Sequence, residues 1–221
     1  MFDLPHGLTP GRTTLDLNER FLDLALGGAA WVLWLLVGMS VMSVAIMIER
    51  ALHYRSVALR ERSLSLAQGK MLSALATKLD TPGARMFERL LRDGGGGGGG
   101  GEALGLCVES TRAVEKVRLE RNLGLLGTIA ANAPFVGLLG TVLEILRVFH
   151  LLGEQGVGSA QDAASIMTGI SEALVATGVG LMVAIPATAA YNAFVRRVAG
   201  LLSVAQQTAT RALAFAGREA I

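Results

Sequence analysis

The chain has 221 residues, of which 52 % are hydrophobic and 17 % are charged, and its formal net charge is +2. This composition is too apolar for an ordinary soluble domain and predicts an integral membrane protein surrounded by lipid. The small positive charge gives no support for a nucleic-acid partner, because basic residues in such a protein are interpreted relative to its spans. A single cysteine, Cys107, excludes an intramolecular disulfide, and three scattered histidines predict no metal site.

The first predicted elements are a lead-in segment, residues 1–23, and a membrane helix, residues 24–48. Residues 13–26 mix Leu and Phe with acidic and polar residues, so they are expected to lie at the membrane surface. The chain starts with acids and has no small-residue cleavage site, so no signal peptide is predicted. The 25 residues between Asp23 and Glu49 are uncharged, whereas a helix needs about 20 to cross the hydrocarbon core.

The segment 49–121 has apolar residues at helical spacing and charged faces. It is predicted to extend the first two membrane helices as a helical cytoplasmic stalk. Residues 81–83, Thr-Pro-Gly, are predicted to form a turn. The eight glycines at 94–101 cannot hold a helix or pack a core, so they predict a mobile tether. No Gly-Lys-Ser/Thr sequence follows them, so a nucleotide-binding loop is not indicated.

Two further membrane helices are predicted at 122–146 and 164–195. The first is rich in Gly and Ala and has Pro134 in its middle, a composition that allows helices to pack closely in lipid. The second carries one charge, Glu172, and contains Pro186. Both prolines are predicted sites of helix kinking or packing, because proline lacks the N–H that a helix interior uses.

The distribution of basic residues predicts the orientation of these spans. Lys and Arg crowd both ends of segment 49–121 and recur after the third span, whereas residues 150–163 contain none. The positive-inside rule therefore places segment 49–121 and the tail 196–221 in the cytoplasm. The N-terminus and the loop 147–163 are then expected on the periplasmic side.

Polar residues inside the apolar spans are the candidate functional groups. No nucleophile, base and orienting group occur together, so the chain is not expected to be an enzyme and no cofactor is expected. Counting about 1.5 Å per residue from the cytoplasmic arginines places Thr141 and Thr177 about 30 and 29 Å up their helices. On the same scale Glu144 and Glu172 lie about one turn further out. An acid at such a site can load and release a proton, and hydroxyls can pass hydrogen bonds inward.

Each of these residues also has a structural interpretation. Glu172 fits a solvated acid at the outer end of a helix, and the two threonines fit interhelical packing with hydrogen bonds to the preceding turn. Glu144 and Arg147 lie one turn apart and pair with each other, or else modulate the entrance to a pathway. Glu172 and Thr177 are about 140° apart on an ideal helix, so a path touching both is wide or passes between subunits.

Two stretches in the last spans carry a resemblance. The sequences NAPFVGLLGTV, residues 132–142, and GISEALVATGVGLMVAIPATAAYNAFVRR, residues 169–197, resemble the paired signature of the ExbB/TolQ branch of the MotA/TolQ/ExbB proton channel family. The resemblance implies an all-α membrane protein with three spans and long helical cytoplasmic extensions. It also implies a homopentamer around a pore that holds the single-span helices of a partner, ExbD or TolR, with an essential Asp.

What the resemblance implies for function is an inner-membrane motor of Gram-negative bacteria. Inward proton flow would drive motion that is transmitted to TonB or TolA, with Glu172, Thr141 and Thr177 on the proton pathway. Glu144 departs from the pattern, since the family commonly has Gly there, and the glycine tether is also unusual. Three functions stay open: an ExbB-type subunit that energises TonB-dependent transport across the outer membrane, a TolQ-type subunit of the Tol-Pal envelope-integrity system, and a non-conducting membrane scaffold.

Overall fold

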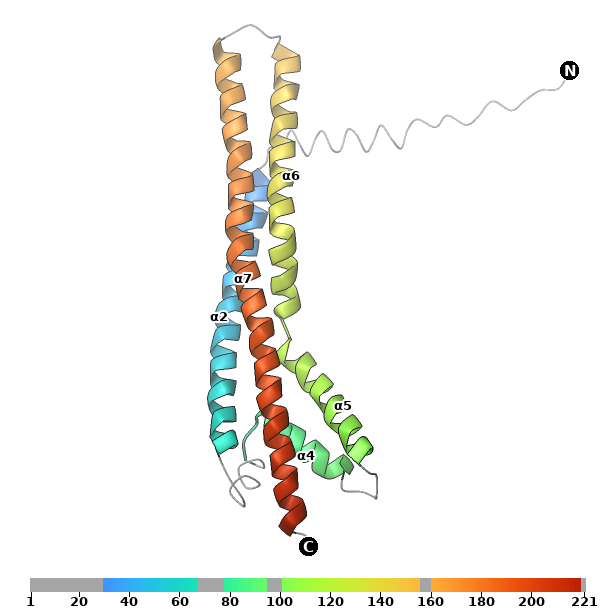
Figure 1. Ribbon diagram of the computed structural model, residues 1–221. Helices are drawn as coiled ribbons and strands as arrows, with labels where there is room; N and C mark the ends of the chain where they lie inside the picture. The colour runs from blue at the N-terminus through green and yellow to red at the C-terminus, as the bar shows by residue number, and fades with distance from the viewer. Residues whose placement is uncertain (1–29, 67–77, 95–100, 156–159, 220–221) are drawn as a thin grey trace, which may run out of the picture. The chain divides into compact units, whose positions relative to one another are not determined.

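The structure of the chain is a computed structural model that describes residues 30–66, 78–94, 101–155 and 160–219 (Figure 1). Every regular element in these residues is a helix, in the order α2 (Ala30–Leu66), α4 (Pro82–Gly94), α5 (Gly101–Leu119), α6 (Leu123–Gln155) and α7 (Ala160–Glu219). The all-α fold class is therefore confirmed for this part of the chain. The predicted lead-in segment, with its amphipathic stretch, lies outside the described residues.

Three helical segments are long and apolar enough to cross a membrane: Ala30–Leu64, Leu123–Gly153 and Ala163–Arg211. The three expected spans overlap these segments, and the points at which they enter and leave lipid stay predictions. Large apolar side chains are exposed on the single chain, among them Trp34 at 76 % and Met182 at 74 %. Such surfaces need lipid or another protein chain to cover them.

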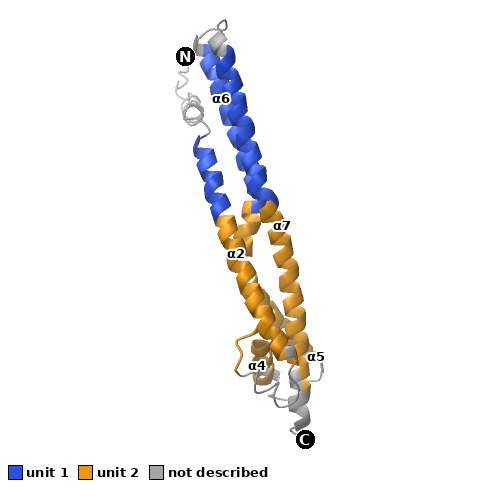
Figure 2. Ribbon diagram, turned by 90° about the vertical axis from the view of Figure 1, so that its left-hand side faces the viewer, with its two compact units in different colours: residues 1–41, 130–185 blue, residues 42–129, 186–221 orange. Residues whose placement is uncertain are grey.

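The chain divides into two compact units (Figure 2). Unit 1 comprises residues 1–41 and 130–185, and unit 2 comprises residues 42–129 and 186–221. Helices α2, α6 and α7 contribute residues to both units. The polar residues singled out in the last two spans all belong to unit 1.

In unit 1, helices α6 and α7 pack backbone against backbone. A Cβ atom added at Gly137 would lie 2.8 Å from the carbonyl oxygen of Ala176. One added at Gly180 would lie 2.8 Å from a backbone carbonyl oxygen of α6. Side chains do not fit at such distances, so glycine at these positions allows the two helices to approach. Helix α2 joins them through Val32, which is fully buried and lies 3.2 Å from the Cβ position of Gly140.

Replacing Gly180 with alanine is expected to lower the free energy of unfolding by about 1–3 kcal/mol, the usual cost of overpacking. Gly178 is the matched control, because its Cβ position on the same helix has no atom within 4 Å. Both variants gain the same helix preference of alanine over glycine, about 1 kcal/mol. Thermal unfolding in detergent, followed by circular dichroism, should therefore show a lower midpoint only for Gly180→Ala. Equal midpoints for the two variants would contradict the close packing.

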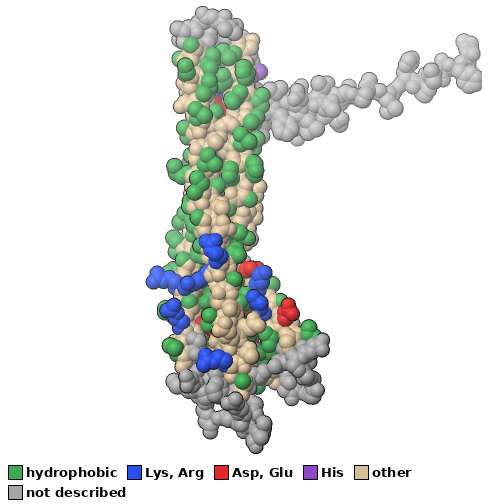
Figure 3. Space-filling model, in the orientation of Figure 1, with side chains coloured by type: hydrophobic (Ala, Val, Ile, Leu, Met, Phe, Trp, Pro, Cys, Tyr) green, Lys and Arg blue, Asp and Glu red, His purple; other side chains and the backbone are tan. Residues whose placement is uncertain are grey.

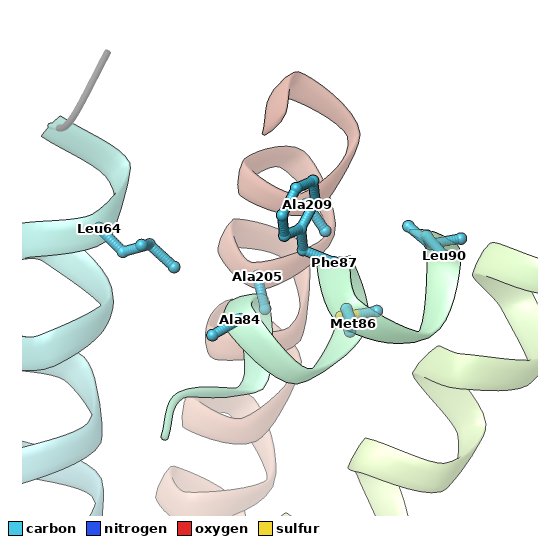
Figure 4. Close-up of a cluster of buried hydrophobic side chains, with 7 residues drawn as sticks. All are labelled: Leu64, Ala84, Met86, Phe87, Leu90, Ala205 and Ala209. Carbon is cyan, nitrogen blue, oxygen red and sulfur yellow. The ribbon is translucent and has the colours of Figure 1, made fainter. Parts of the chain in front are cut away.

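In unit 2, helix α4 forms an apolar cluster with α2 and α7 (Figure 4). The cluster consists of Leu64, Ala84, Met86, Phe87, Leu90, Ala205 and Ala209. The Thr81 hydroxyl accepts the N–H of Ala84 at 3.2 Å, and Pro82 occupies the first helical position, where a missing N–H costs nothing. The turn predicted at residues 81–83 is present as a bend at Thr81, and it is wrong at Pro82 and Gly83, which already belong to α4.

The predicted tether of residues 94–101 differs from the structure at its two ends. Helix α4 includes Gly94 and helix α5 begins at Gly101. Glycine is common where a helix ends, because it adopts the conformations that the last turn needs. The remaining glycines, 95–100, lie outside the described residues.

Helices α5 and α6 are separate elements. Residues 120–122 interrupt them, and Asn122 has a φ of 65°, a left-handed conformation that asparagine tolerates. The Asn122 side-chain amide donates a hydrogen bond to Glu49 Oε2 at 3.3 Å. The prediction of a continuous stalk on the second membrane helix is therefore wrong at this point. Helix α2, by contrast, continues unbroken to Leu66.

Candidate functional site

The two threonines of the candidate pathway bond to consecutive carbonyls of one helix. The hydroxyl of Thr177, on α7, donates to the carbonyl oxygen of Gly137 at 3.4 Å. The hydroxyl of Thr141, on α6, donates to the carbonyl oxygen of Leu138 at 2.7 Å. Thr141 follows Gly137 by four residues, which is about 6 Å along a helix axis. The structure thus brings the two hydroxyls within about one helical turn along α6.

Glu172 lies on a different face of α7 from the helix contacts of unit 1. It is exposed, whereas its neighbours Ala173 and Ala176 are 3 % and 0 % exposed. Among the residues that the structure describes, none forms a hydrogen bond or ion pair with Glu172. Thr177 is half-buried and turned toward α6. Glu172 and Thr177 are therefore not brought together within one chain.

Glu144 is buried in the packing of α6 against α7. Its Oε1 accepts a hydrogen bond from Arg147 Nη1 at 3.2 Å, which makes an ion pair, and lies 3.9 Å from the Cβ position of Gly169. The residue is 2 % exposed, which a carboxylate tolerates only with charged or hydrogen-bonding partners. The pairing of Glu144 with Arg147 that the spacing predicts is present. Glu144 faces Gly169 of α7, which lies about one turn before Glu172.

The two prolines lie inside helices. Pro134 is an interior residue of α6 and Pro186 of α7, and each helix continues without interruption through its proline. Their part in kinking the helices stays a prediction. Cys107 is a free, partly buried thiol that packs against the apolar cluster of α4. Among the described residues, no three His, Cys, Asp or Glu side chains are grouped so that they could hold a metal ion.

Unit 2 contains buried charges that the sequence analysis did not predict. Glu115 on α5 is fully buried, and its Oε2 accepts hydrogen bonds from Arg85 Nε at 3.0 Å and Nη2 at 2.8 Å. Arg118 Nη1 lies 3.4 Å from the other carboxylate oxygen. Burial lowers the pKa of Arg85, but hydrogen bonds to Glu115 and Asp80 outweigh it and raise the pKa above its usual value. The Arg85 guanidinium therefore stays charged, and its hydrogen bonds to Glu115 join α4 to α5.

Glu61 on α2 is a second buried acid, 1 % exposed. Its Oε2 accepts the backbone N–H of Gly83 at 3.3 Å, so the carboxylate faces the positive end of α4. The sequence has no local signal for either contact, because Glu61 and Glu115 lie in ordinary charged stretches. Their partners are 22 and 30 residues away along the chain.

Comparison with known proteins identifies the family. The sequence model of the MotA/TolQ/ExbB proton channel family matches residues 78–207. The biopolymer transport protein ExbB of Aquifex aeolicus is 48 % identical over 90 residues, which cover 41 % of this chain and 58 % of that protein. An ExbB-like protein of Synechocystis is 35 % identical over 168 residues, covering 72 % of this chain and 78 % of that protein.

The Tol-Pal system protein TolQ of Pseudomonas aeruginosa is 39 % identical over 118 residues, which cover 52 % of this chain and 49 % of that protein. The match thus spans little more than half of the Aquifex relative and about half of TolQ. The three long apolar helices agree with a multi-pass membrane protein. Because the family model matches more than half of its residues, the chain belongs to the MotA/TolQ/ExbB proton channel family.

Proposed function

We propose that the chain is a proton-conducting subunit of a bacterial inner-membrane motor of the ExbB/TolQ branch. In this proposal several copies, five by analogy with the family, surround a pore. The pore holds the membrane helices of an ExbD-like partner with an essential Asp. Proton flow through the pore drives a TonB-like transducer that energises transport across the outer membrane.

The observation that carries the proposal is the pair of threonines within the family-matched segment. Thr177 donates across the helix interface to Gly137, and Thr141 donates to the next carbonyl of α6. Both side chains are half-buried in the single chain. A hydroxyl both donates and accepts hydrogen bonds, so the two can continue a water chain through an apolar wall. Glu172, five residues before Thr177, supplies the titratable group.

Assembly completes the pathway in this proposal. Glu172 is exposed on a single chain while Thr177 faces α6, so a path that reaches both passes between copies. Three helices are also too few to enclose a sealed polar path. The ion pair of Glu144 with Arg147 lies within α6, where it would fix the Glu144 side chain against Gly169 of α7, and so modulate the pathway indirectly.

The energy for such a motor comes from the membrane potential. Each proton charge that crosses gains roughly 2.3 kcal/mol per 100 mV, so a few protons can drive a conformational step without nucleotide. The proposed topology puts the unit 2 segments 49–121 and 196–221 in the cytoplasm, where Lys and Arg gather (Figure 3). The N-terminus and the link between α6 and α7 would face the periplasm.

Replacing Thr177 with valine is expected to reduce proton-driven uptake of iron complexes or vitamins by about tenfold or more, since the loss of one hydrogen-bonding group from an apolar wall costs about 1–3 kcal/mol. Valine keeps the shape and loses the hydroxyl. Thr177→Ser is the matched control, because it keeps the hydroxyl and should retain most activity. The measurement is energised uptake by a deletion strain that carries each variant. If valine lowered thermal stability and left uptake at the wild-type rate, the threonine would be structural and the scaffold alternative would stand.

A TolQ-type role in envelope integrity is the second candidate, and the match to TolQ of Pseudomonas aeruginosa favours it. The two roles differ in the phenotype of a deletion strain. Loss of receptor-dependent uptake with an intact envelope supports the ExbB-type role. Leakage of periplasmic proteins and sensitivity to detergent, with normal uptake, supports the TolQ-type role.

A further inference from the structure

Unit 2 contains a cavity between α2 and α7 that the proton pathway does not use. Its volume is about 330 Å³, within the range of small-ligand sites. Arg62 of α2 and Arg196 and Arg197 of α7 line it, together with Gly200, Leu201 and Val204. The cavity therefore combines three arginines with an apolar wall.

The lining carries excess positive charge. Arg196 and Arg197 are exposed, and neither forms an ion pair with another residue of the described part of the chain. Glu61 is the one acid among the lining residues, and its Oε2 accepts the N–H of Gly83 at the start of α4. Adjacent arginines without a carboxylate partner favour an anion that accepts several hydrogen bonds, and phosphate matches the guanidinium fork.

The cavity is open where a ligand would lie. The Cβ position of Gly200 has no atom within 4 Å, so a side chain added there enters free space. Leu201 is 7 % exposed and forms part of a fixed apolar wall in its packing with Tyr54. An anion with an apolar portion fits this arrangement of charge on one side and hydrocarbon on the other.

We infer that this cavity binds a phosphate group, held by Arg62, Arg196 and Arg197. The phosphodiester of an anionic phospholipid and free inorganic phosphate share this chemistry. Arg196 is the first charged residue after the apolar run of α7, so in the predicted topology it lies at the cytoplasmic edge of the bilayer, where headgroups are. Binding there ties α2 to α7 within unit 2.

The test compares variants of the full chain purified as its oligomer. Arg196→Gln/Arg197→Gln removes the charges, and Gly200→Leu fills the cavity while all three arginines stay. Arg55→Gln/Arg60→Gln is the matched control, because these exposed arginines of α2 do not line the cavity. Each protein is titrated with mixed detergent micelles that contain phosphatidylglycerol, with mixed micelles that contain phosphatidylcholine, and with inorganic phosphate at constant ionic strength. Thermal midpoints and native mass spectrometry report binding.

The wild type and the control are expected to bind phosphatidylglycerol or phosphate, and both cavity variants to bind about tenfold more weakly or not at all. Binding of the lipid alone identifies a headgroup as the source, whereas binding of inorganic phosphate identifies a soluble anion. Equal weakening of the control, or undiminished binding by Gly200→Leu, would overturn the site, since either result means general surface attraction. If the double variant did not fold, Gly200→Leu would decide. No preference of the wild type for either anion over phosphatidylcholine would also overturn it.

Discussion

Replacing Glu172 with glutamine is expected to abolish proton-driven work while the oligomer stays intact. Glutamine has nearly the same shape and still forms hydrogen bonds, but it cannot take up and release a proton. Glu172 is exposed on the single chain and has no partner among the described residues, so the fold does not depend on its charge. Energised uptake in a deletion strain should fall to background, and the purified complex should elute at the wild-type size.

Glu144→Gln is the matched control for this prediction. The same change at Glu144 weakens the ion pair between this buried carboxylate and the half-exposed Arg147, at 3.2 Å, so it should lower thermal stability more than Glu172→Gln does. Uptake per folded complex should fall far less than for Glu172→Gln. Wild-type uptake by Glu172→Gln would remove the basis of the proposed pathway, whatever the behaviour of Glu144→Gln.

Replacing Arg85 with methionine is expected to lower the free energy of unfolding by about 3 kcal/mol, the lower end of the range for breaking a buried ion pair. Glu115 is fully buried, and without the two hydrogen bonds from Arg85 its charge keeps only the longer contact to Arg118. Thermal unfolding of the detergent-purified chain measures the effect as a lower midpoint.

Two further variants isolate this ion pair. Arg89→Met changes an arginine one turn along α4 that makes no ion pair within the described residues, so its midpoint should stay near that of the wild type. Adding Glu115→Leu to Arg85→Met removes the stranded charge and should recover much of the loss. An unchanged midpoint for Arg85→Met would mean that the pair contributes no net stability.

The sequence predicted the long helices well because their signals are local. Uncharged runs longer than a bilayer core identify α2, α6 and α7 without knowledge of their neighbours. Helix α4 was not predicted as a separate element, although Thr81 and Pro82 form a recognised start signal, because Thr-Pro-Gly was interpreted as a turn. The break between α5 and α6 contains no proline or glycine from which it could be predicted. It depends on the left-handed conformation of Asn122, which the sequence does not specify.

The candidate site was predictable as a set of residues, and less so as an arrangement. Depth along a helix follows from counting residues, which placed Thr141 near Thr177. Rotation about the helix axis depends on packing, which is why the burial of Glu144 against Gly169 and the exposure of Glu172 could not be read from the chain. Contacts such as Arg85 with Glu115 depend on the meeting of α4 and α5, which no local pattern encodes.

The two threonine hydroxyls differ in how readily they can reorient. The bond from Thr141 to Leu138, at 2.7 Å, is short, whereas the bond from Thr177 to Gly137, at 3.4 Å, is near the limit of a hydrogen bond. Little free energy is therefore lost when the Thr177 hydroxyl turns toward a water molecule, whereas the Thr141 hydroxyl has a stronger bond to break. In the proposed pathway, where each hydroxyl must rotate before it passes the next proton, Thr141 would therefore reset more slowly than Thr177 and set the pace of the relay.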